Sequence, residues 1–435
     1  MSRISAAAKL SLDRRRRLLG LPAEQLLDHV TDHLYGEADT LKAWIPPGET
    51  YLRSLDALAH GSAANKMERR RAIPIGVKDV IDVDGLPTRA GSKARADAPP
   101  CQVDAVAVAR LKVRGFVPVG KTVTTEFAYV DPADTVNPFD HRHTPGGSSS
   151  GSAAAVGGGI VPLALGTQTA GSVCRPAAFC GTFAFKPTTG RTPSEGLTPF
   201  APSFDTIGVL GLRLDWVIEA SLAIIDEPMP TPHDSRTRVG VVSAAYYQSI
   251  SPEAHEQLAM SALALQARGH TVAALTLDVD FEHLRTAHRR VMQFEAHVAH
   301  GALLATRADM LAPAWRGALE AGARLTADEY RRDLQQLEAA RNAVLRATDA
   351  VDVVLLPPAF GDAPEGLSTT GAAGLIIPWT YATTPLAVLP TSLSGQGLPL
   401  AVMLAGKPSE DRQAGSMSLA IARILAERGL SIDRV

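Results

Sequence analysis

The glycine- and serine-rich segment 146–152 is the feature that most constrains how this chain folds. Glycine has no Cβ atom, so backbone N–H groups stay unmasked and a hydrophobic core packs poorly around such a segment. A flexible linker is excluded, because apolar and foldable sequence follows directly at 153–156 and 160–165. A second segment of similar texture, 166–172, ends at Ser172. Serines in a glycine-rich backbone are typical of a nucleophile beside an oxyanion hole.

From residue 73 onward, short apolar runs with strand character alternate with helical runs. This alternation predicts an α/β fold. Residues 1–70 read as an N-terminal helical segment that packs on a core formed by residues 71–435. Within that core, the block 281–349 is almost wholly helical and is interpreted as an insertion, with a capping box at Thr326 and Glu329 ahead of its last helix.

Composition and charge exclude several classes of protein. A net charge of −2 over 435 residues argues against a general nucleic-acid binder and against a strongly membrane-attracted surface. The four arginines at 14–17 are interpreted as a solvated helix face. No apolar run approaches the roughly 18 residues that span a membrane, and the start of the chain lacks a signal-peptide pattern. Three cysteines fit a reducing cytoplasm without a disulfide framework, and the spacing of Cys174 and Cys180 fits no zinc site.

Two motif matches lose their meaning in context. Segment 115–122 matches the phosphate-loop pattern, but its loop positions have strand character and Pro118 lacks a backbone N–H. Segment 147–151 matches the nucleophile-elbow pattern, with Ser149 as the nucleophile. That elbow requires a strand directly before it, whereas the preceding residues 137–145 are rich in turns. No histidine stands in a context that would complete a Ser-His-Asp triad, so both interpretations are disfavoured.

Lys78 lies inside the apolar strand-like segment 73–81. Burial favours the neutral form of a lysine, lowers its pKa and makes it a competent general base. The alternative is a lysine that keeps its charged end in water and pairs with Asp79. Taken alone, the local sequence leaves both interpretations open.

At this point the sequence resembles the amidase signature family. Ser172 follows Ser148 by 24 residues, as in the family, and the resemblance is dense over 73–210 and weaker to the end of the chain. It rests on the motifs at 74–79, 120–122, 126–128, 145–152, 166–172, 175–181 and 185–188. The resemblance implies one large α/β domain whose central mixed sheet is covered by helices on both faces.

The resemblance also implies a Ser-Ser-Lys triad. Ser172 would be the nucleophile, Ser148 would relay the proton after a cis Gly147–Ser148 peptide bond, and Lys78 would be the base. Thr167 would hold Ser148 in place. The oxyanion hole would be formed by the backbone N–H groups of Thr169, Ala170, Gly171 and Ser172.

The chain departs from the commoner form of the family in ways that bear on the substrate. Gln168 stands where an acidic residue is usual, and Ala170 where glycine is usual. Arg175 follows the nucleophile by three residues, a variant that is similar to malonamidase-type members. The resemblance implies that this arginine binds a substrate carboxylate; the alternative is a structural salt bridge, since an arginine fork suits either task.

The function implied is hydrolysis of a C–N amide bond through an acyl-enzyme, without a metal or an organic cofactor. Candidate substrates are small amides, including carboxylate-bearing malonamate-like amides and ureides. The alternative is an amidotransferase A-type subunit that supplies ammonia from glutamine to a partner. The resemblance further implies a cytoplasmic homodimer. We expect the pocket wall to come from 125–134, 190–205, the helical insertion and 375–385.

Overall fold

The computed structural model describes residues 5–60, 72–233, 235–243, 246, 249–277 and 279–432. The expected boundary between residues 70 and 71 lies outside these described residues. The α-helices are α1 (Ala6–Gly20), α2 (Ala23–Leu41), α3 (Glu49–His60), α5 (Val106–Val113), α6 (Ser150–Gly157), α7 (Cys174–Phe179), α8 (Leu214–Ile224), α9 (Pro252–Ala267), α10 (Phe281–His300), α11 (Ala302–Thr306), α12 (Pro313–Ala323), α13 (Ala327–Thr348), α14 (Ile377–Tyr381) and α15 (Asp411–Glu427). The strands are β1 (Trp44–Ile45), β2 (Ile73–Lys78), β3 (Phe116–Thr122), β4 (Leu163–Gln168), β5 (Phe183–Lys186), β6 (Thr206–Gly211), β7 (Arg238–Val242), β8 (Thr271–Leu275), β9 (Val353–Leu356), β10 (Leu386–Leu393) and β11 (Pro399–Ala405).

The strands form one mixed sheet, as expected, in the order β1-β3-β2-β4-β6-β5-β10-β11-β9-β7-β8. Strand β2 runs parallel to both β3 and β4, whereas β4, β6, β5, β10, β11 and β9 pair antiparallel in turn. Strands β2, β4 and β6 are buried along their whole length. Side chains on both faces of these strands are therefore covered by helices, which is why the strands read as continuous apolar runs in the sequence.

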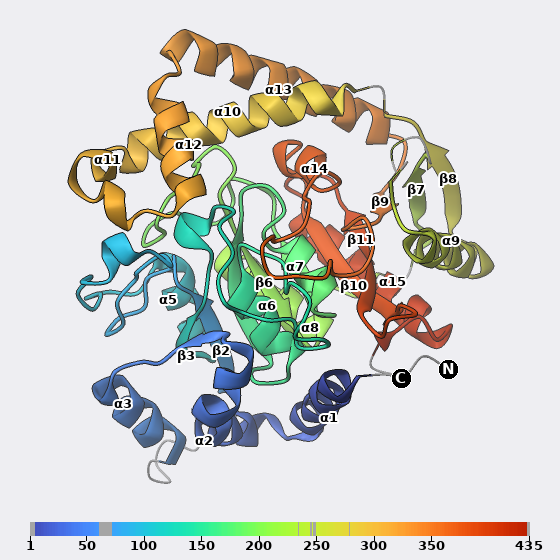
Figure 1. Ribbon diagram of the computed structural model, residues 1–435. Helices are drawn as coiled ribbons and strands as arrows, with labels where there is room; N and C mark the ends of the chain where they lie inside the picture. Colours follow the sequence, from blue (N-terminus) through green and yellow to red (C-terminus); the bar gives the residue numbers. More distant parts are fainter. Residues whose placement is uncertain are drawn as a thin grey trace.

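Helices cover the sheet on both sides. Helices α6 and α7 contact each other and the central strands, and Figure 1 shows both in front of the sheet. Helices α5, α8 and α15 form a second packed group, which contacts β3, β5, β6 and β10. Parallel neighbours end at the same edge of a sheet, so the carboxyl ends of β2 and β4 bring Lys78 and Thr167 close together.

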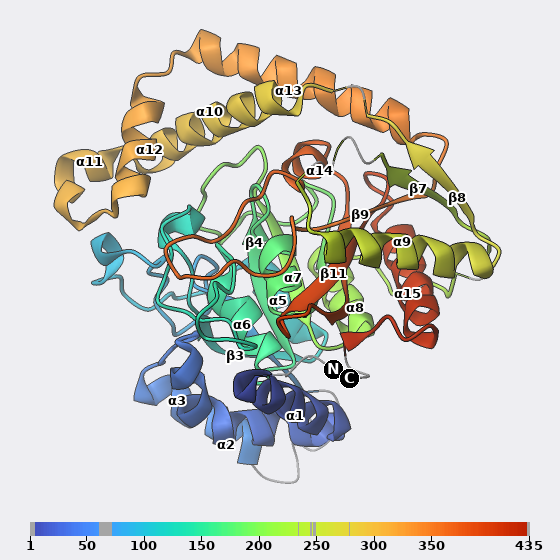
Figure 2. The same cartoon turned by 45° about the vertical axis from the view of Figure 1, so that its right-hand side comes forward.

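The block 281–349 forms a helical layer across one side of the molecule. Helix α10 packs against α12 and α13, and Figures 1 and 2 both show α10 and α13 side by side above the sheet. The predicted capping box is present, because Thr326 accepts from the Glu329 N–H while the Glu329 side chain accepts from the Thr326 N–H. Helices α1 to α3 lie on the opposite side of the molecule from α13.

Two details of the sequence interpretation are tested by the packing. Segment 116–122 is strand β3, so the phosphate-loop match is a buried strand, as predicted. The arginines at 14–17 were expected to form a solvated face, but Arg15 is 1% exposed and its guanidinium carbon lies 6.0 Å from the centre of the Phe139 ring. Arg16 and Arg17 are exposed, as expected, but the expectation was wrong for Arg15, because α1 packs on the core through this side chain. Within the described residues, no helix combines the length and the apolar character that a membrane crossing requires.

Candidate active site

The last residue of β2, Lys78, is wholly buried and contacts the serine-rich loop. Lys78 Nζ lies 2.8 Å from Ser148 Oγ and 2.8 Å from Thr167 Oγ1. The structure thus brings together three residues that are separated by up to 89 positions in the chain. Ser148 follows a cis peptide bond with Gly147, as expected.

Burial lowers the pKa of Lys78 well below its usual value, and the nearby charge of Asp205 only partly opposes this effect. A lowered pKa increases the share of the neutral amine, whose lone pair can accept a proton. The alternative pairing with Asp79 belongs to another lysine: Lys121 Nζ lies 3.3 Å from Asp79 Oδ1, and both side chains are buried. The structure therefore favours the neutral-base interpretation of Lys78.

The glycines at 146 and 147 allow the serine loop to pack tightly. Gly146 has φ +80°, and a Cβ atom on Gly147 would lie 2.7 Å from Thr370 Cγ2. Ser149, the nucleophile of the elbow pattern, is fully buried, and its Oγ bonds to the backbone N–H and carbonyl of Thr167. Ser149 is therefore part of the scaffold.

The segment Thr169–Ser172 connects β4 to α7, and each of its carbonyl groups has a donor. His288 Nε2 lies 3.0 Å from the Thr169 carbonyl, and Thr380 Oγ1 donates to the Ala170 carbonyl at 2.6 Å. The Gly171 carbonyl accepts from the Arg175 N–H, and the Ser172 carbonyl accepts from the Ser149 N–H. By contrast, no acceptor among the described residues takes a hydrogen bond from the N–H groups of Ala170, Gly171 or Ser172. Such free, fixed N–H groups suit an oxyanion hole.

The hydrogen bonds of Gln168 explain why an amide stands where an acidic residue is usual in the family. Its Oε1 accepts from the N–H groups of Val173 and Cys174 at 3.0 Å each, and its Nε2 donates to Thr380 Oγ1 at 3.0 Å. Thr380 in turn donates to the Ala170 carbonyl. An amide side chain supplies both an acceptor and a donor, whereas a carboxylate supplies acceptors only. The Gln168 side chain thus connects the residues that follow Ser172 to Thr380 in α14.

A cavity of about 350 Å³ opens above this segment. Its walls come from the expected regions around 125–134 and 190–205 and from α10; the last wall is formed mainly by 370–374, just before the stretch that we predicted. The lining residues are Ala128, Tyr129, Val130, Thr169, Ala170, Ser172, Arg175, Phe200, Arg285, His288, Arg289, Met292, Thr370, Gly371, Ala372, Ala373, Gly374 and Ile377. Ser172 thus faces a space large enough for a small-molecule ligand.

Arg175 lies at the floor of the cavity and is 5% exposed. Its Nη2 donates to the Gly147 carbonyl at 2.5 Å and to Thr370 Oγ1 at 3.2 Å. Its Nε has no partner within the described part of the chain, and burial lowers its pKa to about 10. No carboxylate among the described residues pairs with it, so the structural salt bridge, the alternative interpretation of this arginine, is absent there.

Asp205 and His288 were not singled out from the sequence, although both support the segment that holds Ser172. Asp205 accepts hydrogen bonds from Thr169 Oγ1, from the Phe200 N–H and from the Ala201 N–H at 2.6, 2.7 and 2.9 Å. Burial lowers the pKa of His288 to about 4, so its imidazole is neutral near pH 7. No local pattern marks either residue, because each reaches the site from a distant part of the chain.

The described residues contain no group of histidines, cysteines and carboxylates that could hold a metal ion. Cys174 and Cys180 are buried, unpaired thiols, and burial raises the pKa of Cys174 to about 12. At that pKa, Cys174 stays protonated near pH 7 and is a poor nucleophile.

Comparisons with known proteins place this geometry in context. A family model described as Amidase matches residues 51–414. A glutamyl-tRNA(Gln) amidotransferase subunit of Chloroflexus aggregans (strain MD-66 / DSM 9485) is 35% identical over 255 residues, 51% of this chain and 51% of that protein. AtzE, the 1-carboxybiuret hydrolase subunit of Pseudomonas sp. (strain ADP), is 36% identical over 217 residues, 45% of this chain and 48% of that protein. The matches to these two relatives thus span about half the length of each.

The similarity to solved structures extends over nearly the whole chain. A crystal structure described as that of an amidase superposes with a TM-score of 0.82 at 27% identity. The match covers 96% of this chain and 99% of that chain. The mixed sheet with helices on both faces is therefore shared along its full length.

Proposed function

The chain belongs to the amidase family, and on that premise we propose that it hydrolyses the C–N bond of a small carboxylate-bearing amide through an acyl-enzyme on Ser172. The observation that carries the proposal is the buried Lys78, whose pKa is lowered by burial and whose Nζ lies 2.8 Å from Ser148 Oγ, beside the cavity that Ser172 lines. A neutral amine within hydrogen-bond reach of a hydroxyl meets the geometric requirement for a general base.

The first half of the reaction transfers the acyl group. Lys78 takes the proton of Ser148, Ser148 takes the proton of Ser172, and Ser172 Oγ attacks the amide carbonyl. The N–H groups of Ala170, Gly171 and Ser172, with that of Thr169, stabilise the oxyanion that forms. When the C–N bond breaks, the proton returns through Ser148 to the nitrogen, and ammonia or an amine leaves.

The second half of the reaction regenerates the enzyme. Water attacks the ester carbonyl of acyl-Ser172, and its proton passes through Ser148 to Lys78. Collapse of this second oxyanion breaks the ester bond, and the proton returns to Ser172 Oγ. The free acid leaves, and Thr167 keeps Lys78 and Ser148 aligned throughout.

Arg175 supports a substrate with a carboxylate on its acyl side. A buried guanidinium without a carboxylate partner is costly, and a bound carboxylate supplies the missing charge and accepts from the free N–H groups. This selectivity resembles that of malonamidase-type members, and we propose it from Arg175 and its surroundings.

The relatives named as amidotransferase subunits favour a second candidate, release of ammonia from glutamine for a partner protein. Glutamine carries an α-ammonium group as well as an α-carboxylate. Among the described residues, no aspartate or glutamate lines the cavity to receive that ammonium group. The lining therefore favours an acidic amide over glutamine.

The test is a screen for release of ammonia from malonamate, biuret-type ureides, aliphatic and aryl amides, and glutamine. We expect malonamate-like amides to react, Ser172→Ala to abolish turnover and Lys78→Ala to reduce it severely. Mass spectrometry of enzyme quenched during turnover should show the acyl group on the peptide that contains Ser172. Wild-type turnover by Ser172→Ala, or unchanged preference for acidic amides in Arg175→Gln, would contradict the proposal. Turnover of glutamine alone, without a partner, would favour the second candidate.

A further inference from the structure

The face of α10 that lines the cavity carries two arginines. Arg285 and Arg289 are four residues apart, His288 and Met292 lie on the same face, and all four line the cavity. Residues spaced three and four apart on a helix share one side, so this face is built into the cavity wall. None of these positions takes part in the catalytic steps proposed above.

Arg289 has no ion-pair partner among the described residues and is exposed at the mouth of the cavity. Burial raises the pKa of Tyr129, and Arg289 opposes that effect, which places its charge near the phenol on the cavity wall. Arg285 is half-buried, and its Nη1 lies 3.0 Å from the position that a Cβ atom on Gly374 would take. The two guanidinium groups therefore approach the opening from α10.

Among the described residues, Arg285 forms one ion pair, and that pair is weak. Its partner is Glu282, one turn earlier on α10, whose side chain is 77% exposed. Solvent-exposed pairs of this kind contribute little to stability, so a ligand can compete for the arginine. With Arg175 at the floor, the described lining holds three guanidinium groups and no carboxylate.

From this arrangement we propose that the substrate carries a second carboxylate, on the amine side of the scissile bond, which binds Arg285 and Arg289. The inference rests on the proposed function and extends it from primary amides to N-acyl amino acids with an acidic acyl group. The acyl half must reach Ser172 and Arg175 at the floor, so the amine half extends toward the opening through which it leaves. A cavity of about 350 Å³ lies in the range that accommodates ligands larger than a three-carbon amide.

The experiment compares N-malonylglycine with N-propylmalonamate, which has nearly the same length but lacks the second carboxylate. We expect wild-type kcat/KM to be roughly tenfold or more higher for N-malonylglycine, and Arg285→Gln/Arg289→Gln to remove most of that preference. The loss should appear mainly in KM, because the arginines contact a part of the substrate that does not react. Malonamate lacks the amine-side carboxylate, so the double variant should lose far less kcat/KM with malonamate than with N-malonylglycine.

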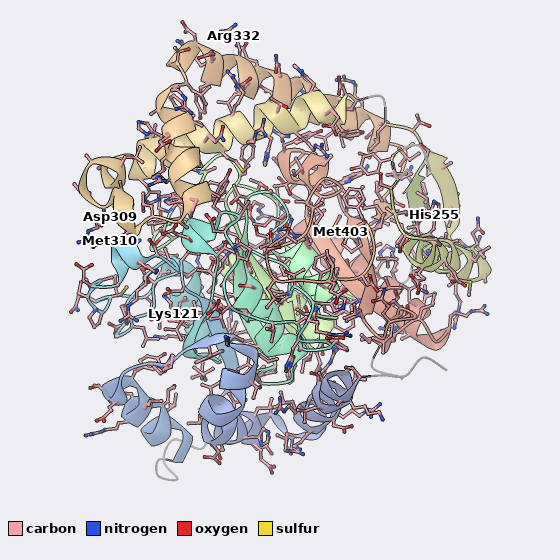
Figure 3. The ribbon with its side chains drawn as sticks, viewed as in Figure 1. Lys121, His255, Asp309, Met310, Arg332 and Met403 are labelled. Carbon is pink, nitrogen blue, oxygen red and sulfur yellow. The ribbon has the colours of Figure 1, made fainter. Side chains whose placement is uncertain are left out.

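Arg332→Gln is the matched control, because Arg332 is exposed on the outer side of α13, far from the cavity (Figure 3). We expect this variant to keep the wild-type preference. A binding measurement separates recognition from turnover: calorimetry with N-malonylglycine in a Ser172→Ala background should show weaker binding when the α10 arginines are replaced. High salt should weaken wild-type binding more than binding by the double variant.

Equal kcat/KM for the two malonyl amides in the wild type, or an undiminished preference in the double variant, would overturn the second carboxylate site. If malonamate hydrolysis depends on Arg175 but the wild type does not prefer N-malonylglycine over N-propylmalonamate, only the inference of a second carboxylate site is overturned. If none of these amides is hydrolysed and none binds to Ser172→Ala, the proposed function falls together with it.

Discussion

Removing the Thr380 hydroxyl should impair both stability and turnover. Thr380 is fully buried, and its Oγ1 donates to the Ala170 carbonyl at 2.6 Å and accepts from Gln168 Nε2 at 3.0 Å. Thr380→Val keeps the shape of the side chain but leaves the fully buried amide donor of Gln168 without its partner. Each buried polar group left unsatisfied costs about 1–3 kcal/mol, and the half-buried Ala170 carbonyl lies near the low end. We expect a loss of about 2–3 kcal/mol in the free energy of unfolding.

The effect on catalysis follows from the position of the oxyanion hole. Complete loss of one oxyanion donor typically costs about 100- to 1,000-fold in kcat. Thr380→Val releases the Ala170 carbonyl but keeps every N–H donor, so a smaller loss of about 10- to 100-fold in kcat/KM is expected. The assay is release of ammonia from malonamate, with denaturant unfolding of the same preparations.

Two controls make the result specific. Thr380→Ser keeps the hydroxyl and loses one methyl group, so it should lose about 1 kcal/mol of stability and little activity. Thr391→Val removes another buried hydroxyl, which bonds to the Leu400 carbonyl within the β10–β11 pair, away from the cavity. It should lose stability with unchanged kcat/KM. Wild-type kcat/KM in a folded Thr380→Val protein, or equal losses in Thr391→Val, would refute the reasoning.

Three further predictions concern the base and its surroundings. Below the usual lysine pKa of about 10.4, the unfolded chain binds a proton at Lys78 that the folded chain does not. The stability of the wild type therefore falls as the pH falls from about 10 toward the lowered folded pKa, and Lys78→Met should gain stability relative to the wild type over that window. A stability difference that does not change with pH would contradict this. Asp205→Asn removes a charge that raises the pKa of Lys78, so the acidic limb of the kcat/KM profile should move to lower pH, whereas a shift to higher pH would count against a lysine base. Ser149→Ala should keep turnover within about tenfold of the wild type, whereas Ser148→Ala should lose far more, and the reverse order would restore the elbow interpretation of Ser149.

The sequence predicted those parts of the fold and the site that depend on local patterns. The alternation of segments with strand and helix character predicted the α/β class, and the capping box at Thr326 predicted the start of α13. The contact of Lys78 with Ser148 was expected from the family motifs that contain these residues, whereas Thr167, which was expected to hold Ser148, bonds to Lys78 Nζ. The role of Ser172 as nucleophile stays a prediction until the variants are assayed.

What the sequence could not predict arises from long-range packing. Thr380 reaches the Ala170 carbonyl across 210 positions, and His288 reaches the Thr169 carbonyl across 119. Each is an ordinary residue in a helix, and only the docking of α10 and α14 against the segment gives it a partner. The burial of Arg15 and the pairing of Lys121 with Asp79 were missed for the same reason. Charged residues in a sequence are expected to be exposed to solvent, and only the tertiary structure shows which of them are covered.

The electrostatics of the cavity form a consistent whole around an anionic substrate. A lysine base must be neutral, and burial disfavours the charged form of Lys78. The arginine lining of the same cavity attracts a carboxylate. Within the described part of the chain, the charge of Asp205 opposes the effect of burial, and the Thr169 hydroxyl and two backbone N–H groups already donate to its carboxylate. A cavity lined by carboxylates would raise the pKa of Lys78 and repel an acidic amide. The neutral base and the anionic substrate therefore both require a lining without carboxylates.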